Sequence, residues 1–281
     1  MNLAHLLQRQ ARMDPLRPAI LNGNQLAATH GQWAQRCQQL AHQFQAAGLQ
    51  PGDRVALFMH NHVRYLEVLF GAWWAGLAVV PINAKLHVRE AQWIIDNAQA
   101  RWAFVTSDIT SDTGEHLTGL ERVIDVDSAE ADALWQLPTS PLDTRITERR
   151  ADDLAWLFYT SGTTGRPKGV VWGLDDMLDI QSFTTYGAIG LTPPETMEGR
   201  VEVALDPATK RPTTLPLAPF MHGTALTSTL NTLLLGGTMV IAPSSRFSAD
   251  LAVDALVNHN VTRLIVAGDS VASLVIEALD A

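Results

Sequence analysis

The segment between Leu157 and Gly169 combines the residue types that a nucleotide triphosphate site requires. It reads Leu-Phe-Tyr-Thr-Ser-Gly-Thr-Thr-Gly-Arg-Pro-Lys-Gly. Glycines let backbone N–H groups approach several phosphate oxygens, and hydroxyl groups add donors that can also help to hold a metal-bound phosphate. Lys168 supplies a compact positive charge. We therefore predict that this loop binds nucleotide phosphates through Thr160, Ser161, Gly162, Thr163, Thr164, Gly165 and Lys168.

Two well-known phosphate loops do not fit this spacing. A Walker loop needs glycine immediately before the lysine, where this chain has Pro167. The dinucleotide fingerprint Gly-x-Gly-x-x-Gly does not match the segment either. An ordinary solvated loop rich in serine, threonine and glycine is the simplest alternative. The apolar stretch 154–159 argues against it, because it predicts a short strand that leads directly into the loop.

His222 is the second candidate for chemistry, within the run Pro-Leu-Ala-Pro-Phe-Met-His-Gly-Thr-Ala at 216–225. A single histidine ahead of a predicted helix more often serves a local hydrogen bond. An imidazole can also stabilise a carboxylate that attacks phosphorus. Because His222 lies downstream of the phosphate loop in the chain, we favour a role in the active site.

Helical and strand patterns alternate along the chain, which predicts an α/β protein with mainly parallel strands. We expect helices at 31–47, 63–75, 88–97, 224–235, 249–259 and 271–279. We expect strands at 54–59, 77–82, 101–106, 122–126, 154–159, 238–242 and 262–267. A polar run at 128–153 predicts a surface connection.

Domain boundaries follow from the same patterns. Residues 1–191 are expected to form a first α/β subdomain that includes the phosphate loop at 157–169. A run rich in proline, threonine, glutamate and lysine predicts an irregular connection at 192–212. Residues 213–281 then form an incomplete second α/β subdomain.

Composition narrows the class of protein. The 281 residues carry a formal net charge of -9, which argues against nucleic-acid binding. Cys37 is the only cysteine and there is no secretory signal, which favours a cytoplasmic location. The apolar stretch 65–82 contains Glu67 and is broken at Gly76, so we expect a buried helix and strand there rather than a membrane span.

The run at 157–169 closely resembles the signature loop of the adenylate-forming (AMP-binding) superfamily, which includes acyl-CoA synthetases, peptide-synthetase adenylation domains and luciferases. The run at 216–225 resembles a second block of that superfamily. Within it, residues 168–172 and 221–225 look most like bacterial fatty-acid or steroid-side-chain acyl-CoA synthetases. The resemblance implies two stacked, mainly parallel sheets with flanking helices, as in the large N-terminal domain of an acyl-CoA synthetase.

The resemblance also implies a reaction. A small-molecule carboxylic acid attacks the α-phosphate of ATP to give an acyl-adenylate and pyrophosphate, and the CoA thiol then forms a thioester. Lys168 and His222 take the catalytic roles, with His222 near the acyl substrate. No metal is bound by the protein alone; Mg²⁺ arrives with ATP, assisted by Thr163 or Thr164.

The chain departs from the family pattern in its second half. It has no Tyr-Gly-x-Thr-Glu block and no C-terminal lid domain with a catalytic lysine. We therefore expect a truncated polypeptide with little activity alone, and an exposed sheet edge that favours a homo-oligomer. Two alternatives are a peptide-synthetase-type adenylation domain and a catalytically silent nucleotide-binding module.

Overall fold

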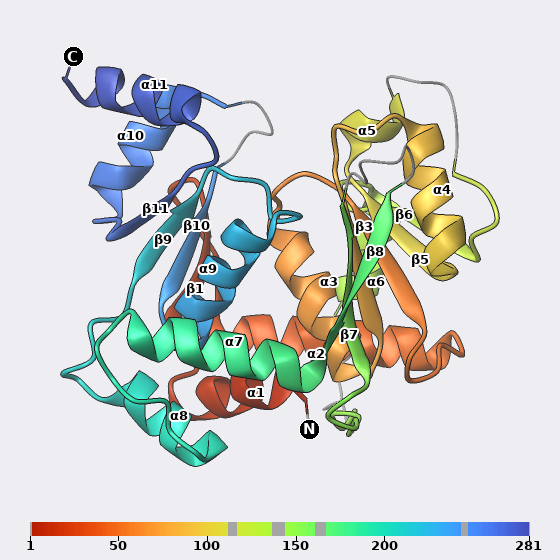
Figure 1. The fold of residues 1–281 in the computed structure, drawn as a ribbon, viewed down its shortest axis with the longest axis horizontal. Helices are drawn as coiled ribbons and strands as arrows, with labels where there is room; N and C mark the ends of the chain where they lie inside the picture. Colours follow the sequence, from red (N-terminus) through yellow and green to blue (C-terminus); the bar gives the residue numbers. More distant parts are fainter. Residues whose placement is uncertain (1, 112–116, 137–143, 161–166, 243–246, 281) are drawn as a thin grey trace. The chain divides into compact units, whose positions relative to one another are not determined.

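The computed structural model describes residues 2–111, 117–136, 144–160, 167–242 and 247–280. The chain divides into two compact units, and both draw on segments that are distant in sequence. The first unit comprises Met1–His5 and Gln35–Leu178, and the second comprises Leu6–Ala34 and Asp179–Ala281. Each unit contains its own sheet (Figure 1).

The sheet of the first unit has six strands in the order β6-β5-β3-β4-β7-β8. Its strands are β3 (Arg54–Phe58), β4 (Ala78–Ile82), β5 (Ala100–Val105), β6 (Arg122–Asp125), β7 (Leu154–Thr160) and β8 (Lys168–Gly173). Neighbouring strands are parallel except for the last pair, in which β8 runs antiparallel to β7. Strands β3 and β4 are almost entirely buried, as expected for parallel strands covered on both faces.

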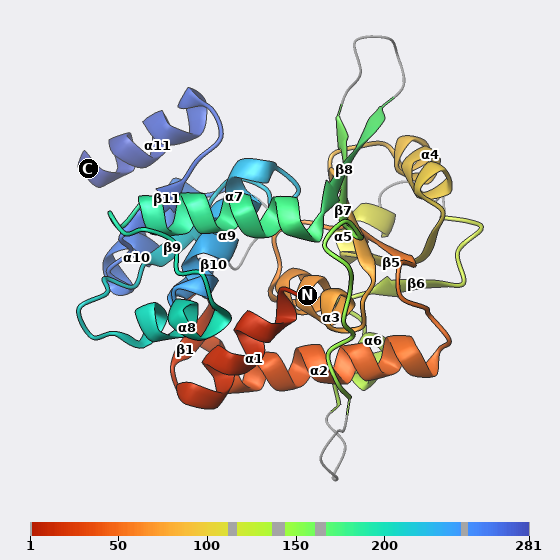
Figure 2. The same cartoon turned by 60° about the horizontal axis from the view of Figure 1, so that its bottom comes forward.

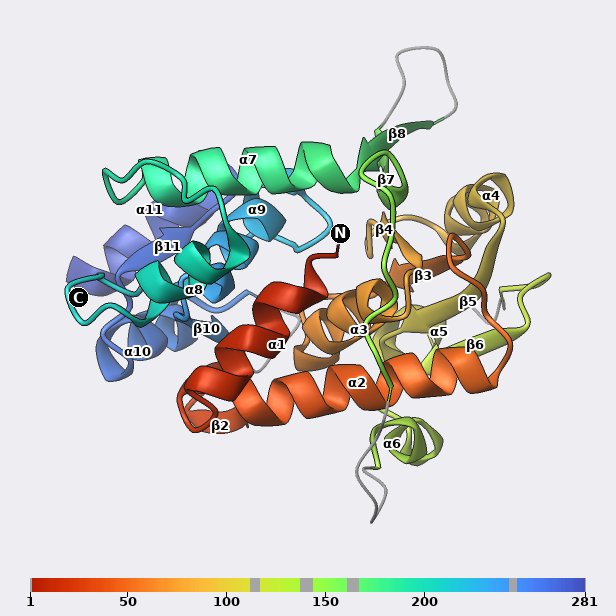
Figure 3. The ribbon, with the colours of Figure 1, turned by 90° about the horizontal axis from the view of Figure 1, so that it is seen from below.

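Helices cover both faces of this sheet (Figure 3). Apolar residues of α4 (Val88–Ala98) and α5 (Ser107–Ser111) pack on the face that includes Ala56 and Val80. The opposite face carries α2 (His30–Ala46), α3 (Val63–Trp74) and α6 (Ala129–Trp135). There the ring of Phe44 lies 5.4 Å from that of Trp102, and the ring of Trp135 lies 6.2 Å from that of Phe104.

The sheet of the second unit has five strands in the order β11-β9-β10-β1-β2. They are β1 (Pro18–Asn22), β2 (Gln25–Thr29), β9 (Thr213–Pro216), β10 (Thr238–Ile241) and β11 (Arg263–Ile265). Its helices are α1 (Ala4–Met13), α7 (Leu174–Gly187), α8 (Met197–Leu205), α9 (Gly223–Leu234), α10 (Ala249–Asn258) and α11 (Asp269–Asp280), of which α1 and α7 begin in the first unit. Leu215 and Val240 pack with α10 and α11, whereas Thr214 faces α9, where its hydroxyl lies 2.6 Å from that of Thr232.

The predicted α/β class with two mainly parallel sheets is confirmed. The division of the chain differs from the predicted boundaries, because β1 pairs in parallel with β10 and so joins residues 6–34 to the second unit. The segment expected to be a surface connection and the one expected to be irregular each contain a helix. Helix α6 follows an N-cap bond from Ala131 N to Ser128 Oγ, and α8 follows a similar bond from Gly199 N to Thr196 Oγ1.

Several further expectations are met. Helices α2, α3, α4 and α9 begin and end within one residue of the predicted positions. Trp73 and Trp74 are buried, as expected for core residues. In the described parts of the chain, no helix has the length and apolar character needed to cross a bilayer.

His30 is a fully buried titratable side chain of the second unit. Its Nε2 lies 3.3 Å from the carbonyl oxygen of Gly237, so this nitrogen carries the proton and donates it. Its Nδ1 has no hydrogen-bond partner among the described residues. Burial lowers the pKa of His30 to about 4.

This lowered pKa predicts a loss of stability in mild acid. The neutral ring is favoured by folding, so its contribution is present above the unfolded pKa of about 6.5 and is lost as the pH falls toward 4. We expect the free energy of unfolding to decrease by about 1.4 kcal/mol per pH unit over this interval from His30 alone. His30→Gln keeps a donor for Gly237 and should flatten the profile measured by circular dichroism. An unchanged slope would contradict the prediction; His42→Gln, at an exposed position of the same helix, should keep it.

Candidate functional site

The β7–β8 hairpin brings two of the predicted phosphate-binding residues together. Thr160 is the last residue of β7, Lys168 is the first of β8, and the two are paired in the antiparallel register (Figure 2). Both side chains are exposed. Ser161, Gly162, Thr163, Thr164 and Gly165 lie outside the described residues. The hairpin therefore places a hydroxyl and a lysine at the two ends of the predicted loop.

The element that follows this loop differs from the one that follows a Walker loop. A Walker loop joins a strand to the N-terminus of a helix. Here the chain returns along β7 as a strand, with Tyr159 paired to Gly169 and Phe158 to Val170. Strand β8 lies at the edge of its sheet, and Val171 is 66% exposed. The candidate phosphate loop thus connects two strands at a sheet edge.

His222 occupies the N-cap position of α9 in the second unit. Its side chain is exposed and makes no capping hydrogen bond. The residues on either side hold it in place: Phe220 is 1% exposed, and Ala225 and Leu226 are fully buried. The imidazole is thus anchored through the backbone and faces solvent. Lys168 belongs to the first unit.

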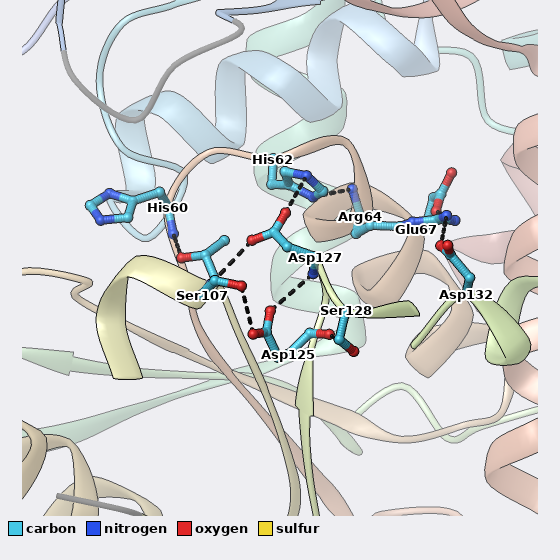
Figure 4. Close-up of polar contacts among 10 residues, drawn as sticks. His60, His62, Arg64, Glu67, Ser107, Asp125, Asp127, Ser128 and Asp132 are labelled. Atoms are coloured by element: carbon cyan, nitrogen blue, oxygen red, sulfur yellow. Dashed lines mark hydrogen bonds and ion pairs between the residues drawn. The ribbon is translucent and has the colours of Figure 1, made fainter. Parts of the chain in front are cut away.

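A polar cluster at the carboxyl ends of β3, β5 and β6 was not identified as a site from the sequence (Figure 4). The chain passes from β3 to β4 on one side and then crosses to β5 on the other, so β3 and β5 flank a topological switch point. In open α/β sheets this is where ligands most often bind. A signal was available, because His60, Ser107 and Asp127 each follow the end of a predicted strand within a few residues.

Two histidine–aspartate contacts lie in this cluster. His60 Nε2 is 3.1 Å from Asp108 Oδ2, and His62 Nε2 is 3.5 Å from Asp127 Oδ1. The Nδ1 of His62 accepts a hydrogen bond from Arg64 N, so the Nε2 of its ring carries the proton. Burial lowers the pKa of His62, and the carboxylate of Asp127 opposes this shift.

Hydrogen bonds connect the strand ends to one another. Ser107 Oγ donates to Asp125 Oδ2 at 2.6 Å, and Ser107 N donates to Asp127 Oδ2 at 3.1 Å. Asp127 N donates in turn to Asp125 Oδ1. These carboxylates are satisfied by protein donors, so the cluster fastens the ends of β3, β5 and β6. The described residues contain no group of three or more histidine, cysteine, aspartate or glutamate side chains placed to hold a metal.

Comparison with known proteins assigns the chain to a family. The model of a family described as AMP-binding enzyme matches residues 7–279. The chain belongs to the AMP-binding enzyme family. The predicted relationship to adenylate-forming enzymes is thereby confirmed.

Individual relatives of this chain are CoA ligases. A 3-oxocholest-4-en-26-oate–CoA ligase of Rhodococcus rhodochrous is 26% identical over 294 residues, which cover 100% of this chain and 51% of that ligase. A feruloyl-CoA synthase of an Amycolatopsis species is 32% identical over 255 residues, covering 90% of this chain and 46% of the synthase. The chain therefore spans about half the length of these curated relatives.

A solved structure with the same fold supports the assignment of the architecture. The N-terminal domain of FACL13 from Mycobacterium tuberculosis aligns with a TM-score of 0.77 at 24% identity. The alignment covers 98% of this chain and 64% of the solved one.

Proposed function

We propose that this chain supplies the ATP-phosphate site and part of the carboxylate site of an AMP-forming acid–thiol ligase. The observation that carries the proposal is the β7–β8 hairpin, which pairs Thr160 with Lys168 at the ends of the signature loop. ATP and CoA are the co-substrates, and Mg²⁺ enters bound to the ATP phosphates. Membership in a family of AMP-binding enzymes supports this assignment.

The proposed roles follow from where charge develops. When a carboxylate oxygen attacks the α-phosphorus, the bond to pyrophosphate breaks and negative charge moves onto the departing group. Donors fixed ahead of the reaction stabilise that charge most effectively. Lys168, Thr160 and the loop residues Ser161, Gly162, Thr163, Thr164 and Gly165 serve this purpose in our proposal, with Thr163 or Thr164 assisting Mg²⁺. His222 orients the attacking carboxylate.

Binding of Mg-ATP tests the phosphate site. We expect Lys168→Ala to weaken binding to the 281-residue chain about tenfold or more, since it removes a charge-assisted contact. Isothermal titration with Mg-ATP and with magnesium pyrophosphate gives the two affinities. Lys210→Ala removes the same charge at an exposed position of the second unit and is the matched control. Equal affinities in the two variants would exclude Lys168 from the site.

Pyrophosphate exchange identifies the acid. The relatives are named for a steroid side-chain acid and for ferulate, so the panel contains steroid, aromatic and fatty acids. The chain should be assayed alone and within the complete reading frame that encodes it. Acid-dependent exchange followed by thioester formation with CoA supports the ligase. Exchange without transfer to CoA favours a peptide-synthetase-type domain, and ATP binding without exchange in either form favours a silent module. Oligomer formation through a sheet edge stays a prediction.

A further inference from the structure

Tyr159 connects the base of the β7–β8 hairpin to helix α4. Its hydroxyl donates a hydrogen bond of 2.7 Å to Asn97 Oδ1, and its ring lies edge-on to Trp93 with centroids 6.1 Å apart. Asn97 and Trp93 are four residues apart and so share one face of α4. All of these residues belong to the first unit. A single aromatic side chain thus makes both a polar and an aromatic contact with the helix.

Gly169 provides the space in which this ring lies. Gly169 is the register partner of Tyr159 on β8. A Cβ atom on Gly169 would come within 3.3 Å of the Tyr159 ring and 3.1 Å of Leu157 Cδ1. Both distances are closer than most side chains tolerate, so any larger residue would displace the ring or the strand. The Tyr159 ring therefore lies against the backbone of β8, one residue beyond Lys168.

In the described part of the chain, the hairpin is exposed at the end next to the predicted loop. Strand β8 is an edge strand whose first four residues are exposed, and β7 is its neighbour in the sheet. On its other side, β7 pairs with β4 through Trp156 and Val79, three residues before Tyr159. Helix α4 is in contrast well anchored, with Ile94, Ile95 and Ala98 buried in the core. A helix anchored in the core and an exposed hairpin are thus joined through Tyr159.

We propose that Tyr159 is a positioning residue for the phosphate loop. In this role its contacts with Asn97 and Trp93 fix the direction in which Thr160 and Lys168 leave the sheet. The inference rests on the proposed function, because it assigns a purpose to a loop that holds ATP phosphates. Tyr159 itself touches no substrate in this proposal. It acts through Thr160, which follows it on β7, and Lys168, which pairs with Thr160 on β8.

Substitutions that separate the hydroxyl from the ring test the proposal. Tyr159→Phe keeps the ring and loses the bond to Asn97, and should weaken Mg-ATP binding about threefold to tenfold, the range for one net hydrogen bond. Asn97→Leu should have the same effect, and the double variant should be no worse than either single one. Asn97→Asp keeps an acceptor for the phenol and should restore most of the affinity. Gln92 lies on the same helix as Asn97. Gln92→Ala removes its bonds to Asp96 and to the Thr118 carbonyl and should leave binding unchanged.

Amide hydrogen exchange in nucleotide-free protein gives a second readout. Tyr159→Phe and Asn97→Leu should speed exchange at residues 168–172 without lowering the thermal midpoint more than Gln92→Ala does. Normal Mg-ATP affinity and unchanged exchange in Tyr159→Phe would overturn the positioning role and leave the proposed function intact. Failure of the unsubstituted chain to bind Mg-ATP or pyrophosphate would overturn the proposed function and the positioning role together.

Discussion

Gly237→Ala is expected to destabilise the second unit by about 3 kcal/mol or more. Gly237 lies between α9 and β10, where an added Cβ would be 2.2 Å from the carbonyl oxygen of Pro212 and 2.9 Å from that of Thr232. Both neighbours are backbone atoms, so a change of rotamer cannot relieve the contact. The same Pro212 oxygen accepts a hydrogen bond from Thr238 N at the start of the β9–β10 pairing. Moving it disturbs this ladder, and such overpacking costs about 1–3 kcal/mol or more.

Chemical denaturation followed by circular dichroism measures this effect. Gly187→Ala is the matched control, because a Cβ there meets nothing within 4 Å. We expect its free energy of unfolding to lie within about 0.5 kcal/mol of the unsubstituted chain. If Gly237→Ala is equally well tolerated, the tight approach of Pro212 to this glycine is wrong.

Removal of both arginines around Glu67 is expected to cost about 3–5 kcal/mol of stability. Glu67 on α3 is completely buried. Arg36 Nη1 lies 2.9 Å from its Oε1. Arg64 Nη1 lies 2.9 Å from its Oε2 (Figure 4). The Arg64 guanidinium also stacks 4.2 Å from the ring centre of Trp135. Arg36→Met with Arg64→Met therefore leaves a buried carboxylate without the two charges that offset its desolvation.

A third substitution separates this explanation from a loss of packing. Adding Glu67→Met removes the uncompensated charge and should restore most of the free energy of unfolding, because apolar replacement of a whole buried ion group is often neutral. Arg150→Met, which breaks an exposed pair with Asp152, should cost less than about 1 kcal/mol. A triple variant no more stable than the double one would show that the charge of Glu67 is not the cause.

Local patterns in the sequence were sufficient for elements with strong periodicity. Helix α2 was predicted within one residue because its apolar residues recur at helical spacing and Gly48 follows its end. Helix α6 was missed, although Ser128 ahead of it is a good N-cap, because the surrounding run is polar. Strand β8 was missed because its valines are exposed on an edge, so the usual alternation with a buried face is absent.

The other features that the sequence did not predict depend on pairing between residues far apart in the chain. Nothing local in residues 18–29 indicates that they complete a sheet with β10, so the predicted division of the chain differs from the two compact units. Of the candidate site, the sequence indicates only the part that is local in the chain. The signature loop could be read from consecutive residues, whereas the support of Tyr159 by α4 depends on residues about 60 positions earlier.

The discontinuity of the second unit has a consequence for synthesis on the ribosome. Pro18 and Thr238 are 220 residues apart, yet Thr238 Oγ1 donates to the Pro18 carbonyl at the β1–β10 junction. At about 5–20 residues per second, roughly ten to forty seconds separate their translation. During that interval the whole of residues 35–178 emerges and can fold. Until then β1 and β2 lack their parallel partner β10. Ile20, which is fully buried in the folded protein, is exposed in the nascent chain during that time, so we expect chaperones to bind this segment.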